Sequence, residues 1–375
     1  MPAQAGTQRL PRSAIGFPRG ANDDTKVIAH CRPGFESECA ADLARIAARA
    51  GVRLHGAPSP HAALVTASLD RYDSSRWQSA LGATPAWFAR SIFVGDGPHA
   101  LPDRDRITPL VTAVRDHGPP FSALWLETPD SNEGKQRSGL CRRLKEPLEA
   151  AAIGEGLLTP GDRRRSRLHV LFLDTTRVLV GTSQRATGSP WPMGIPRLSM
   201  PREAPSRSTL KLAEAFITFL AEDERPRLLK TGMRAVDLGA APGGWTWQLA
   251  ARGLRVTAID NGPLKGAIAH DPLVEHLRVD GLSWRPRRAV DWMVCDIVLQ
   301  PSRIAALVAA WIGDGHCRRT IFNLKLPMKK RYAEVERCSG IIREALERRR
   351  LRHELSFRQL YHDREEITGY CARRD

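Results

Sequence analysis

The chain has 375 residues, 42% of them hydrophobic, and a formal net charge of +16 at pH 7. This length and apolar content allow two or three globular domains and exclude a fibrous or wholly disordered protein. The excess of lysine and arginine indicates a polyanionic partner, nucleic acid first, because cationic side chains placed at phosphates release counterions.

Residues 1–25 are rich in proline, glycine and arginine without a hydrophobic period, which predicts a disordered extension. They lack the apolar block of a signal peptide, and no later run approaches the roughly 18 apolar residues that span a bilayer. Seven cysteines form no C-x-x-C pair and leave one unpaired, so we expect reduced thiols. Together these features predict a cytoplasmic protein.

Two small α+β units are predicted before a linker. The first unit covers residues 26–104 and combines one helix with several strands; the elements are expected at 26–31, 36–50, 62–67 and 87–94. The second unit covers residues 105–187, with elements expected at 107–115, 123–126, 138–152, 168–173 and 177–181. Residues 188–205 are dense in proline and glycine, which favours an ordered linker.

Strands and helices alternate from residue 206 to residue 375, which predicts an α/β domain with a mostly parallel sheet covered on both faces. The strands are expected at 234–238, 255–259, 276–279, 291–295, 318–324, 352–360 and 367–373. In such sheets, ligands bind beyond the carboxyl ends of the strands. The chemistry of this domain is therefore expected at that edge.

The run from Ala235 to Thr246 reads as a buried strand, a glycine-rich turn and the start of a helix. Gly239, Gly243 and Gly244 let the backbone turn tightly and approach a ligand closely. The free N–H groups of the following helix suit a carboxylate or a phosphate. The spacing differs from the G-x-G-x-x-G of dinucleotide-binding folds, so the turn alone predicts a nucleotide-like cofactor without naming it.

Three carboxylates follow three predicted strands and should face one crevice. Asp260 lies about 20 residues after the glycine-rich turn, where a carboxylate is suited to accept hydrogen bonds from ribose hydroxyls. Asp280 could accept one from an adenine amino group, and Asp296 ends the next strand. Each could instead cap the turn that follows it, but three in register favour a shared ligand.

Two lysines are candidates for proton transfer. Lys325 follows an apolar strand, and Lys211 lies on the first turn of a predicted helix; either alone could be a surface residue. A second lysine and a positively charged sulfonium cofactor would lower the pKa of Lys325, whereas a nearby carboxylate would raise it. With Asp296 and Glu366, the two lysines could orient and deprotonate a sugar hydroxyl.

Two other chemistries fit the sequence less well. Cys295 ends an apolar strand, which is typical of a buried thiol rather than a nucleophile. The eleven histidines are scattered, and none pairs at i, i+4 with a carboxylate between, so no metal site is predicted.

The assembled residues resemble the FtsJ-like methyltransferases that use S-adenosylmethionine to methylate ribose 2′-oxygens. From about residue 27 to the end, the chain also resembles the RlmM family, which methylates a cytidine ribose of bacterial large-subunit rRNA. The strings that carry this resemblance are at 31–36, 193–197, 205–212, 292–296 and 322–332. The resemblance implies a Rossmann-like methyltransferase domain preceded by an α+β THUMP-containing RNA-binding region, and cytidine 2498 of the peptidyl-transferase region as the target.

The resemblance also implies the roles of individual residues. The implied contacts of S-adenosylmethionine are Ser208, Gly239, Ala241, Pro242, Gly243, Gly244, Asp260, Asp280 and Asp296. Many relatives have cysteine at the position of Ala241, and a backbone contact survives that change. The implied catalytic tetrad is Lys211, Asp296, Lys325 and Glu366, with Lys325 as proton acceptor and Glu365 as a one-residue alternative to Glu366.

The expected partner is 23S rRNA or its assembly precursor, bound by a monomer that needs neither membrane nor metal. A catalytically silent RNA-binding protein or ribosome-assembly factor on the same scaffold is the alternative. A nicotinamide dehydrogenase is disfavoured, because it would require a G-x-G-x-x-G turn, which this chain lacks. Enzymes that methylate base amino groups usually carry an N/D-P-P-aromatic motif where this chain has Asp296-Ile297-Val298-Leu299, which favours a sugar hydroxyl.

Overall fold

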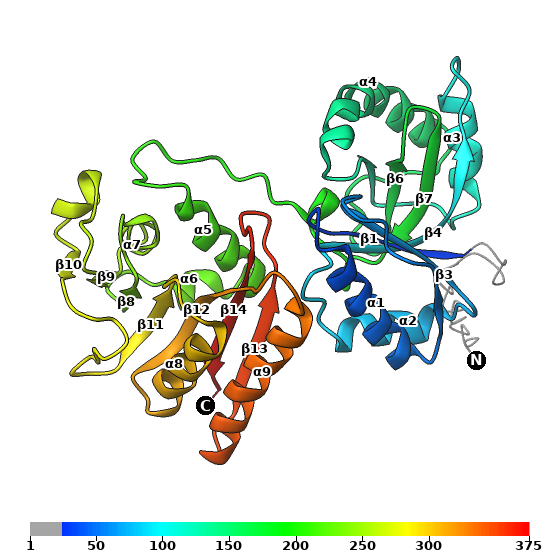
Figure 1. The fold of residues 1–375 in the computed structure, drawn as a ribbon. Helices are drawn as coiled ribbons and strands as arrows, with labels where there is room; N and C mark the ends of the chain where they lie inside the picture. Colours follow the sequence, from blue (N-terminus) through cyan, green and yellow to red (C-terminus); the bar gives the residue numbers. More distant parts are fainter. Residues whose placement is uncertain (1–24, 375) are drawn as a thin grey trace, which may run out of the picture.

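The structure is a computed structural model that describes residues 25–374 and contains two seven-stranded sheets, one in each half of the chain (Figure 1). The predicted extension over residues 1–25 lies almost entirely outside the described residues. No helix in the described part is long and apolar enough to cross a membrane.

The N-terminal sheet has the strand order β2-β3-β1-β4-β7-β6-β5. Its strands are β1 Lys26–His30, β2 Leu54–His55, β3 Leu64–Leu69, β4 Ser91–Ala100, β5 Ala123–Glu127, β6 Arg167–Phe172 and β7 Arg177–Ser183. Strand β4 pairs antiparallel with both β1 and β7. The strands of the two predicted α+β units thus form one continuous sheet, and the division at residue 104 stays a prediction.

Four helices pack on this sheet in two pairs, α1 Glu36–Ala50 with α2 Ser74–Ala83, and α3 Ile107–Arg115 with α4 Asn132–Gly154. Alternate residues of β1, such as Val27 and Ala29, join the core under α1 and α2, because side chains alternate across a strand. Helix α4 begins earlier than the predicted residue 138, because the Ser131 side chain accepts a hydrogen bond from the Gly134 N–H.

The C-terminal sheet has the strand order β10-β9-β8-β11-β12-β14-β13. Its strands are β8 Arg234–Leu238, β9 Arg255–Ile259, β10 Val274–Leu277, β11 Val290–Cys295, β12 Cys317–Lys325, β13 His353–Arg358 and β14 Glu366–Arg373. The five strands from β8 to β12 are parallel, and β14 runs antiparallel to β12 and β13. This is the predicted Rossmann-like α/β sheet.

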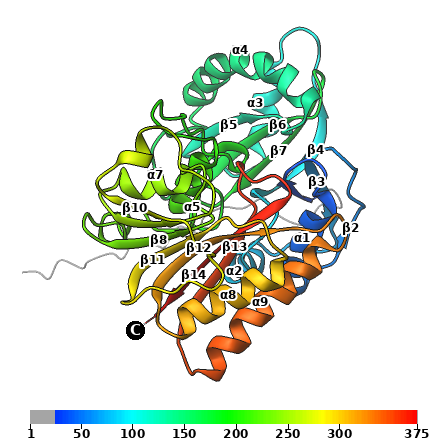
Figure 2. The ribbon, with the colours of Figure 1, turned by 60° about the vertical axis from the view of Figure 1, so that its left-hand side comes forward.

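Helices cover the two faces of the C-terminal sheet unequally. One face packs against α5 Ser208–Phe219, the short α6 Arg225–Leu228 and α7 Gly244–Ala250. The other packs against α8 Pro301–Gly313 and α9 Arg331–Arg348, which lie side by side in Figure 2. Residues 278–289, between β10 and β11, form turns without a helix. The second face therefore has no helix over β8, β9 and β10.

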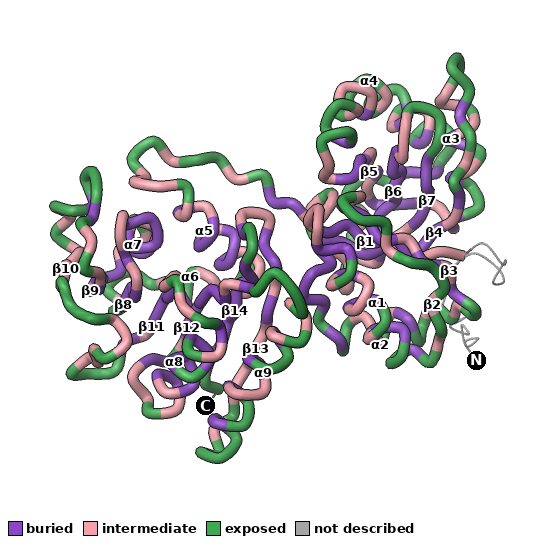
Figure 3. Tube along the Cα trace, in the orientation of Figure 1, coloured by how far each residue is buried: buried purple, intermediate pink, exposed green. Residues whose placement is uncertain are grey.

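The two halves of the chain are in direct contact. The partly buried Arg358, at the end of β13, donates hydrogen bonds to the carbonyls of Ala86 (3.2 Å) and Arg90 (2.7 Å). The Trp87 and Tyr332 rings meet across the same contact at 5.0 Å between centroids. The linker region contains only the short 3₁₀ helix η1, Pro192–Gly194. Figure 3 shows the central strands of both sheets buried and the outer turns of the helices exposed, whereas the edge strand β10 is only partly buried.

All seven cysteines are free and buried, as expected for reduced thiols.

Candidate active site

Four side chains form a closed ring of hydrogen bonds at the carboxyl edge of the C-terminal sheet. Lys211 Nζ donates to Glu366 Oε1 (2.5 Å) and to Asp296 Oδ2 (3.3 Å). Lys325 Nζ donates to Asp296 Oδ1 (2.6 Å) and to Glu366 Oε2. Each lysine therefore contacts both carboxylates, and the formal charges of the ring cancel. The structure brings together all four residues of the predicted tetrad.

Strand register and helix placement create this ring. Lys325 ends β12 and lies directly opposite Glu366, the first residue of β14, in an antiparallel pair. Asp296 follows the last residue of β11, which is the parallel neighbour of β12. Lys211 comes from the first turn of α5, whose apolar side chains Leu212 and Phe216 are buried against the sheet.

The structure distinguishes between the two adjacent glutamates. Glu366 is in the ring, and its side chain is 8% exposed. The Glu365 side chain is 61% exposed and pairs instead with Arg331 at 2.8 Å. Glu365 precedes β14, and its side chain turns toward Arg331 instead of the ring.

In the ring, the pKa of Lys325 is raised, which is the direction expected from a nearby carboxylate. Burial alone would lower the pKa of Lys325, but the carboxylates of Asp296 and Glu366 outweigh burial and raise it. Burial would likewise raise the pKa of Asp296, but Lys211 and Lys325 outweigh it and lower the value. In the ring by itself the two carboxylates therefore set the direction, and the lowering expected from a bound sulfonium stays a prediction.

A buried polar network that the sequence analysis did not identify supports the ring. Asn323 donates through Nδ2 to Asp296 Oδ1 (2.9 Å) and accepts at Oδ1 from the Thr368 hydroxyl (2.8 Å). Thr368 also lies 3.0 Å from both carboxylate oxygens of Asp363. Burial, followed by the nearby Glu366, holds the pKa of Asp363 well above its usual range. The detectable signal was a polar Asn323 inside an apolar strand, two residues before Lys325.

A second unpredicted residue, Glu214, connects α5 to the loop before β14. It is buried and lies three residues after Lys211 on the same helix. Its two carboxylate oxygens accept hydrogen bonds from the backbone N–H groups of Tyr361 (2.8 Å) and His362 (3.0 Å). Glu214 thus holds the loop that leads to Glu366 against the helix that carries Lys211.

The glycine-rich turn lies beside the ring, between β8 and α7. Gly239 has φ = +79°, and a Cβ on it would come within 2.8 Å of Ile297. A Cβ on Gly244 would meet the hydroxyls of Ser208 and Ser206. The backbone between them contains a cis peptide bond before Pro242. The turn therefore leaves room only for backbone, and the start of α5 closes over it.

Asp260 and Ser208 border this turn, as predicted. Asp260 accepts hydrogen bonds from the backbone N–H groups of Ala241 (3.0 Å) and Gly262 (2.7 Å). Ser208 Oγ lies 2.7 Å from Ser206 Oγ. Most N–H groups of the turn are already hydrogen-bonded, so the N–H groups at the start of α7 are the ones that suit a ligand carboxylate. The Asp260 carboxylate and the Ser208 hydroxyl suit the hydroxyls of a ribose.

Asp280 lies in the turn that follows β10 and is not part of the ring. Strand β10 ends at Leu277, three residues before Asp280, whereas the sequence analysis extended this strand to residue 279. The Asp280 side chain accepts from the N–H groups of Leu282 (3.1 Å) and Ser283 (3.2 Å), which stabilises a local turn. Its own neighbour Gly281 packs near Ile297. Asp280 therefore stands at the rim of the candidate cofactor site.

The buried Asp237 gives an independent test of whether a cationic ligand fits this place. Its Oδ2 accepts from the Thr246 hydroxyl (2.7 Å), whereas Oδ1 is buried without a hydrogen-bond partner among the described residues. Burial, assisted by Asp296 and Asp260, raises the pKa of Asp237 to about 7. A buried carboxylate oxygen without a donor favours a ligand that brings positive charge to this edge.

A cavity of about 540 Å³ opens onto the ring and is lined by both halves of the chain. The N-terminal half contributes Arg32, Pro33, Asp130 and Lys135. The C-terminal half contributes Arg207, Ser208, Lys211, Lys325, Tyr361, His362, Asp363, Arg364 and Glu366. Lys325 is the more accessible lysine, with its side chain 25% exposed against 11% for Lys211.

Two other groups of reactive side chains are Cys295 and a cluster of histidines with Asp96. Cys295 is fully buried, and burial raises its pKa to about 12, so it is no nucleophile. In the N-terminal half, Asp96, His99 and His117 lie together, although no metal site is predicted. Asp96 Oδ1 lies 2.6 Å from His99 Nε2 and 3.3 Å from His117 Nε2. The absence of a metal site stays a prediction.

Comparisons with known proteins identify the domains of the chain. Three family models match the chain: "RlmM ferredoxin-like domain" over residues 25–65, "Ribosomal RNA large subunit methyltransferase M, N-terminal" over residues 105–184, and "FtsJ-like methyltransferase" over residues 204–312. Among solved structures, TrmN from Thermus thermophilus covers 93% of this chain and 99% of its own at 14% identity, with a TM-score of 0.33.

Curated relatives match over nearly the full length. Ribosomal RNA large subunit methyltransferase M of Aromatoleum aromaticum is 52% identical over 93% of this chain and 95% of its own. The protein of the same name from Methylococcus capsulatus is 49% identical over 92% of this chain and 97% of its own. Identity at this level over more than nine-tenths of both chains shows that the chain belongs to the RlmM family of ribosomal RNA large subunit methyltransferases.

Proposed function

We propose that this protein transfers a methyl group from S-adenosylmethionine to the ribose 2′-hydroxyl of a cytidine in large-subunit rRNA, with Lys325 as proton acceptor. Membership of the family supports the methyltransferase activity on rRNA. The observation that carries the sugar hydroxyl as acceptor is the ring of Lys211, Asp296, Lys325 and Glu366 beside the glycine-rich turn.

The residues around the turn would hold the methyl donor. Asp260 would accept hydrogen bonds from its ribose, and the N–H groups around Gly243 and Gly244 would face its carboxylate. When bound, S-adenosylmethionine supplies an electrophilic methyl group on a sulfonium. The chain therefore needs only to align the 2′-oxygen with that methyl group and to remove a proton.

Lys325 is proposed to take that proton. As a neutral amine, Lys325 would accept the 2′-hydroxyl proton when the methyl group is transferred. Asp296 and Glu366 hold both lysines at a fixed spacing, and Lys211 helps to balance the two carboxylates. Because the carboxylates raise the pKa of Lys325, the neutral amine depends on added positive charge beside the ring, which a sulfonium supplies.

The N-terminal half is proposed to present the RNA to this site. Arg32 and Lys135 face the same cavity as the catalytic ring, although they come from the other sheet. Two cations on the opposite wall suit the phosphates that flank the target ribose. The target nucleotide, cytidine 2498 by resemblance, is part of this proposal.

Transfer of tritiated methyl from S-adenosylmethionine to unmodified 23S rRNA, followed by nucleoside analysis, tests the proposal. We expect the label in 2′-O-methylcytidine. Label in a base-methylated nucleoside would overturn the sugar hydroxyl as acceptor. No label with protein that still binds S-adenosylmethionine and rRNA would support the silent RNA-binding scaffold instead.

A further inference from the structure

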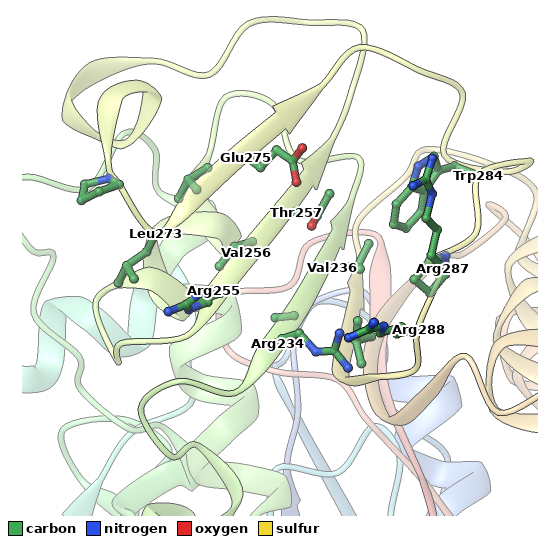
Figure 4. Close-up of a pocket in the computed structure, with 15 residues that line it drawn as sticks. Arg234, Val236, Arg255, Val256, Thr257, Leu273, Glu275, Trp284, Arg287 and Arg288 are labelled. Carbon is green, nitrogen blue, oxygen red and sulfur yellow. The ribbon is translucent and has the colours of Figure 1, made fainter.

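A second basic pocket lies on the C-terminal sheet, at the opposite end of its strands from the catalytic ring. This cavity of about 570 Å³ covers the starts of β8, β9 and β10, on the face that lacks a helix. Figure 4 shows Arg234 and Arg255 at the starts of β8 and β9, and Trp284, Arg287 and Arg288 along the loop before β11. The pocket belongs neither to the ring nor to the glycine-rich turn.

The charge of this pocket is strongly unbalanced. Four arginines line it, whereas Glu275 is its only carboxylate. Arg255, Arg287 and Arg288 are exposed, and none of them forms an ion pair within the described part of the chain. Cations gathered in a concave place without counter-charges repel one another, so an anionic ligand stabilises the arrangement.

The loop that carries two of these arginines is fixed by its own contacts. Arg285 donates to the carbonyls of Leu282 (2.8 Å) and Trp284 (2.7 Å), and its guanidinium lies 5.6 Å from the Trp311 ring of α8. Arg234 donates to the carbonyl of Ala289 at the other end of the loop. Arg285 thus stabilises the conformation of the loop, whereas Arg287 and Arg288 line the pocket.

An aromatic side chain also lines the pocket. Trp284 stacks on the buried Trp311 at 6.3 Å between centroids and remains partly exposed. An indole held in place by a buried partner can stack on an unpaired base, while nearby arginines contact phosphates. Arginines next to a partly exposed tryptophan are typical of surfaces that bind single-stranded nucleic acid.

We propose that this pocket binds the phosphodiester backbone of a single-stranded RNA segment that flanks the methylated nucleotide. The inference rests on the proposed function, since the same RNA must reach the ring. The ring lies on β11, β12 and β14, and β12 is two strands away from β8. The two sites are about 15 Å apart along the strands and about 10 Å or more across them, a span that a few nucleotides can bridge. The excess of positive charge favours RNA over a partner protein as the occupant. A partner protein would have to present several unpaired carboxylates to the pocket.

The triple variant Arg255→Gln/Arg287→Gln/Arg288→Gln of the full chain tests the proposal. Binding of transcribed, unmodified 23S rRNA would be measured over a range of salt concentrations, together with methyl-transfer kinetics. We expect about 10- to 100-fold weaker binding near 0.1 M salt and a loss of about 2 from the salt slope. The KM for rRNA should rise, while the kcat at saturating rRNA stays unchanged.

A matched control removes three exposed arginines elsewhere, as Arg348→Gln/Arg350→Gln/Arg352→Gln. The control should bind rRNA almost as the parent does. Equal losses in both variants would show a general charge effect and overturn the pocket, as would unchanged binding in the first variant. A parent protein that fails to methylate rRNA would contradict the proposed function instead, so the two failures are distinguishable.

Discussion

At the scale of single residues, the active site depends on which atoms the lysines contact. The sequence suggested Lys211, Asp296, Lys325 and Glu366 as partners, and the structure joins them in one ring. The protonation of Lys325 could not be predicted. It depends on two carboxylates that lie within hydrogen-bond distance of one ammonium group. Such distances cannot be derived from the order of the strands.

Replacing Lys325 by alanine should reduce methyl transfer by about 10²- to 10⁴-fold, the range for loss of a positioned base. Binding of S-adenosylmethionine, measured by calorimetry, should remain, because the cofactor residues are untouched. The exposed Lys329 offers a matched control, and Lys329→Ala should retain the parental rate. Retained activity in Lys325→Ala would remove Lys325 from the mechanism.

The raised pKa of Lys325 predicts a rate that increases with pH. A base must be neutral to accept a proton, and a raised pKa keeps most of the lysine protonated at neutral pH. Single-turnover rates should rise up to tenfold per pH unit until the pKa of the loaded enzyme is passed. A profile that is flat from about pH 6 to pH 9 would contradict the assignment of Lys325.

At the scale of elements, the loop from β8 to α7 is specified by its glycines, and this was readable from the sequence. Strands 234–238 and 255–259 have the predicted bounds, because short apolar runs between turn residues have a clear local signal. The end of β10 was less predictable. Asp280 was expected to end this strand, but the strand ends at Leu277. The Asp280 side chain instead stabilises the turn that follows the strand.

Gly239→Ala should weaken binding of S-adenosylmethionine and lower the melting temperature, because a Cβ would come within 2.8 Å of Ile297 at a positive φ. Gly232→Ala is the matched control, since Gly232 has φ = +86° but nothing within 4 Å of its Cβ position. The control isolates the backbone cost, about 1–2 kcal/mol. Equal effects of the two variants on cofactor affinity would show that the space beside Ile297 is not required.

At the scale of the whole molecule, the two halves act on one cavity. The single N-terminal sheet could not be predicted, because β4 and β7 pair across roughly 80 residues without a local sequence signal. The meeting of Arg32 and Lys135 with the ring likewise depends on how Arg358 and Tyr332 dock one half on the other. Such long-range contacts follow from packing, which a motif does not encode.

The net charge of +16 predicts a linear fall of the logarithm of rRNA affinity with the logarithm of salt concentration. Each phosphate neutralised by lysine or arginine releases counterions, so the slope counts contacts. Filter binding over about 0.05–0.4 M potassium chloride would measure it. Affinity that does not change with salt would contradict electrostatic recognition of the RNA.

The buried cysteines allow transient unfolding of this protein to be measured through its native thiols. All seven thiols are buried in the folded state, with Cys141 the most exposed at 8%. Burial raises the pKa of Cys371 and of Cys338 to about 12, so reagents that need a thiolate react slowly with them. Thiol labelling would therefore follow transient unfolding of each half without background from the surface. A cysteine introduced beside the catalytic cavity could carry a fluorophore while every native thiol is left in place.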